Sequence, residues 1–117
     1  MRVLFLCNEW HIKQNLTSWL EDPELETAGY YFVRAVADPL ASQPHIGFDL
    51  ARDTIHDIAA RFPAGPPDLM LCWEPGRVAL PRETAYAPFP VVALFSDWNL
   101  TLRNQAGIFD IYDYIFT

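Results

Sequence analysis

Four side chains that can exchange protons, Glu9, His11, Glu74 and Asp97, each come shortly after an apolar run of the sequence. Carboxylates and a histidine at strand ends are the usual parts of an acid/base site, because loops there face a crevice while the sheet holds their position. Simpler roles also fit these residues: Asp97 as a helix cap, Glu74 in a turn, and Glu9 and His11 as solvated loop residues. A bound hard cation is a weaker alternative, since the carboxylates could hold it but no spaced His/Cys pattern exists.

Three tryptophans, Trp10, Trp73 and Trp98, sit at or near the ends of the same runs. Aromatic side chains suit sugar rings, whose C–H faces are apolar, and they equally suit the rim of a small domain's core. The sequence therefore leaves two roles open for these side chains, as a sugar platform or as core packing.

The segment 68–73 organises the predicted fold. It lies between the turn signal 64–67 and Pro75-Gly76, so its apolar run has the length of a strand. A strand that is apolar at successive positions is covered on both faces, as in the centre of a parallel sheet. Because segments 2–7 and 91–95 share this pattern, we expect three parallel strands whose carboxyl ends gather the acidic residues at one edge. Open α/β folds bind their ligands at that edge.

The other segments alternate between predicted helices and strands. Hydrophobic spacing predicts helical segments within 8–26 and at 27–37, 51–62, 82–86 and 100–106. Strands are expected at 45–49 and 112–117. Strand and helix alternation implies right-handed crossovers, so the sequence predicts an α/β fold: a three-layer sandwich with a mostly parallel sheet of about five strands, Rossmann-like or flavodoxin-like.

Two of the predicted helices have candidate capping residues. Asp49 or Asp53 can serve the N-terminal turn of the helix at 51–62, and Asp97 or Asn99 can cap the short helix at 100–106.

The last predicted strand carries apolar side chains on both sides. Tyr112, Tyr114 and Phe116 project to one side and Ile111 and Ile115 project to the other, and no helix follows, so we expect one apolar face to be uncovered. We therefore expect a single domain over 1–117 that is either a piece of a longer protein or buries this edge against another copy.

The charge and composition of the chain argue against some classes of binding partner. A net charge of -7, with Lys13 as the only lysine, gives no basic patch for nucleic acid or an anionic membrane. No apolar run reaches the length of a membrane span. Cys7 and Cys72 fall in predicted strands, which is typical of reduced core thiols in a cytoplasmic protein; a disulfide between neighbouring strands and a reactive thiol are the alternatives.

The motifs of three common types of catalytic or cofactor site are missing from the sequence. The first glycine after the first predicted strand is Gly29, so the glycine-rich turn that a dinucleotide cofactor requires is missing there. The sequence also has no Gly-x-Ser-x-Gly elbow and no P-loop pattern.

Four segments, in this order, resemble the N-terminal Rossmann-like domain of bacterial GT-B glycosyltransferases. They are Arg2-Val-Leu-Phe-Leu, Pro67-Asp-Leu-Met-Leu-Cys-Trp-Glu, Pro90-Val-Val-Ala-Leu-Phe-Ser-Asp-Trp-Asn and Phe109-Asp-Ile-Tyr-Asp-Tyr-Ile-Phe. The resemblance covers nearly the whole chain. It implies a domain that binds the carbohydrate acceptor, opposite a second Rossmann-like domain that binds the nucleotide-sugar donor.

The resemblance also implies roles for the residues at the strand ends. Asp97 and His11 become the candidate catalytic residues, and the candidate substrate contacts are Glu9, Trp10, Glu74, Trp98 and Asn99. The chain lacks the second domain, so we expect it to bind no cofactor itself and to be inactive in sugar transfer on its own.

A receiver-like or flavodoxin-like interaction module is the alternative. Receivers need an acidic pair after the first strand, an aspartate after the third, Ser or Thr after the fourth, and a lysine after the fifth. The sequence offers Asn8-Glu9, Glu74 and Ser96, but no such lysine. With glutamate in place of the phosphorylated aspartate, only a module without catalytic activity would remain.

Overall fold

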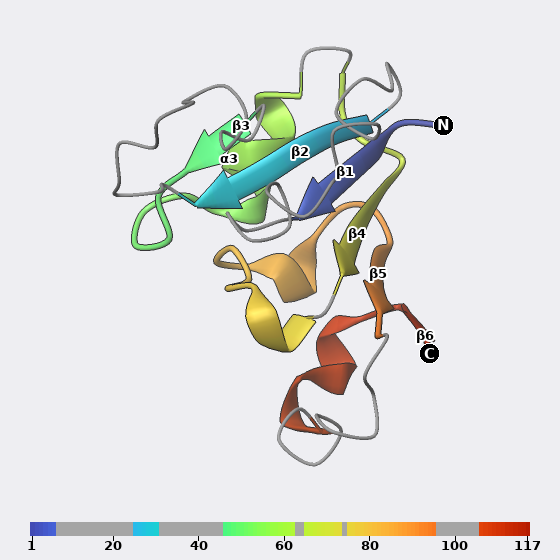
Figure 1. Cartoon of the computed structure of the whole chain (residues 1–117). Helices are drawn as coiled ribbons and strands as arrows, with labels where there is room; N and C mark the ends of the chain where they lie inside the picture. Colours follow the sequence, from blue (N-terminus) through green and yellow to red (C-terminus); the bar gives the residue numbers. More distant parts are fainter. Residues whose placement is uncertain (7–24, 31–45, 63–64, 74, 96–105) are drawn as a thin grey trace, which may run out of the picture.

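The computed structural model describes residues 1–6, 25–30, 46–62, 65–73, 75–95 and 106–117 (Figure 1). Their strands form a 6-stranded sheet in the order β3-β2-β1-β4-β5-β6. Every neighbouring pair is parallel. The strands are β1 (Val3–Leu6), β2 (Leu25–Tyr30), β3 (Ile46–Phe48), β4 (Leu69–Trp73), β5 (Val91–Leu94) and β6 (Tyr114–Phe116). The prediction of an α/β fold with a mostly parallel sheet is therefore confirmed.

The central place of β4 follows from its composition. Leu71 is paired with Phe5 of β1 on one side and with Val92 of β5 on the other. Met70 and Cys72 are fully buried, whereas Leu69, Leu71 and Trp73 are half-buried. The alternation shows that the two faces of the sheet are covered to different extents.

The better covered face holds the hydrophobic core. Leu4, Leu6, Met70, Cys72, Val91 and Ala93 of the strands belong to one buried cluster. The connections add Ile55, Ile58, Val78, Phe89, Phe95 and Tyr112 to this cluster. Phe95 also meets Phe109 edge to face, with ring centroids 6.0 Å apart. Each fully buried aliphatic side chain in such a cluster contributes about 1.5–3 kcal/mol through removal from water.

One α-helix and three 3₁₀ helices connect the described strands. They are α3 (Ile55–Ala60), η1 (Pro75–Arg77), η2 (Thr84–Tyr86) and η3 (Ala106–Ile111). The first turn of α3 is fixed by a capping box: Thr54 Oγ1 accepts from the Asp57 backbone N–H, and the Asp57 carboxylate accepts from the Thr54 backbone N–H. This reciprocal pair satisfies two backbone donors that a helix start would otherwise leave free.

The prediction that Asp49 or Asp53 caps this helix was wrong. Asp49 instead accepts from the Ala51 backbone N–H at 2.8 Å, and Asp53 accepts from the Asp49 backbone N–H at 2.8 Å. These bonds close a turn before the helix, so α3 starts later than the predicted 51–62. Asp53 also receives two hydrogen bonds from Arg61, both 2.9 Å long.

The predicted helix at 27–37 was also wrong over its first residues. Residues 25–30 form β2, paired with β1 on one side and β3 on the other. Gly29 lowers the helix propensity of this segment, and pairing with β1 and β3 provides hydrogen-bond partners for the backbone N–H and C=O groups of β2. Local spacing was therefore overridden by long-range pairing. Residues 31–37 of that predicted helix lie outside the described residues.

Two helices were predicted in the carboxyl-terminal half of the chain, and only one of them can be compared in full with the structure. The turn predicted at 82–86 is present as η2. Residues 100–105 of the predicted helix at 100–106 are outside the described residues, and Ala106 begins η3, which extends to Ile111 and was not predicted. Where the structure describes the chain, it contains no helix of the length and apolarity needed to cross a membrane.

Candidate functional site

The carboxyl edge of the sheet is where sequence reasoning expected the site. Strands β1, β4 and β5 are neighbours and end at Leu6, Trp73 and Leu94. The pairs Leu6↔Cys72 and Trp73↔Leu94 show that these ends lie side by side. Strand order also reverses here, because β2 and β3 extend the sheet on one side of β1 while β4, β5 and β6 extend it on the other. Such a switch point is the usual ligand site of an open α/β sheet.

The candidate side chains themselves lie outside the described residues. They are Glu9, Trp10, His11, Glu74, Asp97, Trp98 and Asn99. Their proposed roles therefore stay predictions. The structure does bring together the strands that precede them: β1 ends three residues before Glu9, and Trp73 immediately precedes Glu74. Trp73 is described, and its half-buried side chain stands at the end of β4.

Cys72 and Tyr112 lie in the core rather than at a reactive surface. Cys72 is a free, fully buried cysteine, and burial raises the pKa of its thiol well above the usual range. Since the thiolate is the nucleophilic form, this cysteine is suited to packing and not to chemistry. Tyr112 is 8% exposed, and burial likewise raises the pKa of its hydroxyl. The free, buried state of Cys72 supports a core thiol over the alternatives of a reactive or disulfide-bonded one.

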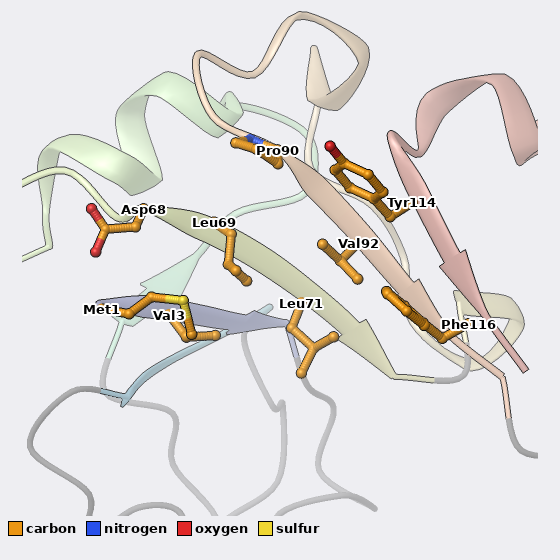
Figure 2. A pocket seen from close by; sticks show the side chains of 9 residues that line it. All are labelled: Met1, Val3, Asp68, Leu69, Leu71, Pro90, Val92, Tyr114 and Phe116. Atoms are coloured by element: carbon orange, nitrogen blue, oxygen red, sulfur yellow. The ribbon is translucent and has the colours of Figure 1, made fainter.

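A separate feature, which we call the open groove, lies on the less covered face of the sheet (Figure 2). Its cavity volume is about 460 Å³. It is lined by Met1, Val3, Asp68, Leu69, Leu71, Pro90, Val92, Tyr114 and Phe116. Several of these residues are at or before the first residues of their strands, so the open groove lies toward the amino ends of β1, β4 and β5.

Asp68 is the only charged side chain in the lining of the open groove. Its carboxylate accepts a 2.6 Å hydrogen bond from the Arg2 backbone N–H and lies 3.7 Å from the Arg2 guanidinium. The hydrogen bond and the nearby positive charge hold the pKa of Asp68 below its usual value. With a paired carboxylate and otherwise apolar walls, the open groove lacks the groups for acid/base catalysis.

Sequence reasoning identified only part of the open groove. Alternation in the last strand predicted that Tyr112, Tyr114 and Phe116 lie on one side and that one apolar face of this strand is uncovered. Tyr114 and Phe116 are 59% and 57% exposed, but Tyr112 precedes β6 and is buried, so its placement on that side was wrong. Sequence reasoning did not identify Met1, Asp68 and Pro90 as lining residues. They lie together only because β1, β4 and β5, which are far apart in the sequence, are neighbours in the sheet. No signal in the sequence marked Leu69 and Leu71, because residues 69–73 are apolar at every position and predicted a strand covered on both faces, whereas these two side chains are only half-buried.

The described residues do not form a metal-binding site. Among them, no group of three or more His, Cys, Asp or Glu side chains is placed to hold an ion. The carboxylates considered as ligands for a hard cation, Glu9, Glu74 and Asp97, belong to the part of the chain that the structure does not describe.

Comparison of the chain with protein-family models, with curated proteins and with solved structures found no match.

Proposed function

We propose that the chain is the acceptor-binding, N-terminal half of a bacterial cytoplasmic GT-B glycosyltransferase. In this proposal its sheet is the middle layer of a three-layer, Rossmann-like sandwich. The strand order supports the proposal, because 3-2-1-4-5-6 is the order of doubly wound nucleotide-binding folds. A fold of this class hosts many activities, so the functional argument depends on the site at the carboxyl edge.

The observation that carries the proposal is the adjacency of three strand ends. β1, β4 and β5 are consecutive in the sheet, and each is followed closely in sequence by an acidic residue. In the proposed site Asp97 and His11 act as the acid/base pair, with one of them accepting the proton of the acceptor hydroxyl. Glu9, Glu74 and Asn99 would bind sugar hydroxyls, while Trp10 and Trp98 would pack on the apolar face of a sugar ring.

The chain does not complete the reaction in this proposal. A second Rossmann-like domain binds the nucleotide sugar and presents its anomeric carbon to the acceptor. The present domain holds the acceptor and binds no cofactor of its own, so sugar transfer requires both halves.

Calorimetric titration with free mono- and oligosaccharides tests this proposal. We expect weak, saturable binding that becomes at least about tenfold weaker, or about 1.4 kcal/mol, in Asp97→Ala and in Trp98→Ala. His56→Ala is the matched control, because His56 is exposed on α3 and has no assigned role in the proposed site. Equal affinities of the wild type and both site variants would refute the site.

A second candidate function is an interaction module of the receiver-like or flavodoxin-like kind. The exposed strand β6 favours it, because an uncovered apolar edge is a typical protein-binding feature. This candidate predicts that a protein partner, and not a sugar, perturbs the molecule. Saturable sugar binding that depends on Asp97 would argue against the module.

A further inference from the structure

We draw no further inference here: the strongest candidate, the open groove with the exposed strand β6 at its border, carries nothing, because Asp68, the only charged residue in its lining, is already paired with Arg2 and nothing in the structure shows what covers the groove or the strand.

Discussion

Tyr112 carries a polar group whose hydrogen-bonding capacity is unused in the described core. Its hydroxyl is buried without a hydrogen-bond partner among the described residues. A buried polar group in this state costs about 1–3 kcal/mol of desolvation, which the ring of the same side chain offsets through its packing.

Removing this hydroxyl should stabilise the protein. We expect Tyr112→Phe to raise the free energy of unfolding by about 1 kcal/mol, because the ring stays and the unpaired oxygen is lost. Tyr114→Phe is the control; the Tyr114 side chain is 59% exposed, so its hydroxyl can be hydrated and the change should be within about 0.5 kcal/mol. Urea unfolding measures both values. A marked loss of stability in Tyr112→Phe would show that the hydroxyl is hydrogen-bonded in solution.

At the scale of secondary structure, α3 is short and depends on its N-terminal cap. It spans Ile55–Ala60, and Ile55 and Ile58 anchor it in the core with no exposed surface. Such a short helix has little intrinsic stability, so the capping box and the buried side chains decide whether it forms.

Loss of the cap should therefore be measurable. Thr54→Ala removes the acceptor for the Asp57 backbone N–H and should lower the free energy of unfolding by about 1 kcal/mol. Thr54→Ser keeps a hydroxyl at the same position and should recover most of that loss. If urea midpoints of the two variants coincide, the Thr54 hydroxyl does not stabilise α3.

Acid should weaken the same region. The Arg61 guanidinium holds the pKa of Asp53 below its usual value, and hydrogen bonds from Thr54 do the same for Asp57. A depressed folded-state pKa contributes stability that is present above the unfolded value, about 3.9, and is lost as the pH falls through the folded one. We expect the urea midpoint to decrease below about pH 4, and less steeply in Asp53→Asn. Identical pH profiles of variant and wild type would contradict this assignment.

The sequence predicted correctly the strands whose ends are marked by turn residues nearby in the chain. The strand around Leu71 is an apolar run between two proline-containing turns, and the strand around Val92 is an apolar run between Pro90 and Ser96. Both appear where expected. β2 was missed because Gly29 and its neighbours become a strand only through pairing with β1 and β3, which local spacing does not report. The role of Thr54 was missed because Asp49 and Asp53 gave an equally good capping pattern, and the turn that they form is visible only in three dimensions.

The candidate site was predictable only as a location. The sheet places the ends of β1, β4 and β5 next to one another, as the three apolar runs implied. The orientation of Asp97, His11 and the other candidate side chains cannot be derived from hydrophobic periodicity, which locates strands and helices but not the direction of the side chains that follow them.

For the molecule as a whole, the two faces and the two ends of the sheet differ in character. One face carries the core cluster, the other carries the open groove near the amino ends of β1, β4 and β5, and β6 leaves an apolar edge (Figure 2). Ligand binding at the carboxyl ends can therefore be tested separately from any event at the open groove or at β6.

The most direct test of the acceptor-binding proposal is backbone amide NMR of the ¹⁵N-labelled chain during titration with free saccharides. We expect saturable chemical-shift changes at the carboxyl ends of the central strands, at Leu6, Trp73 and Leu94, with Val3, Leu69 and Val91 at the amino ends unaffected. Changes confined to the amino ends, or an unchanged spectrum at saccharide concentrations of about 10 mM, would contradict it.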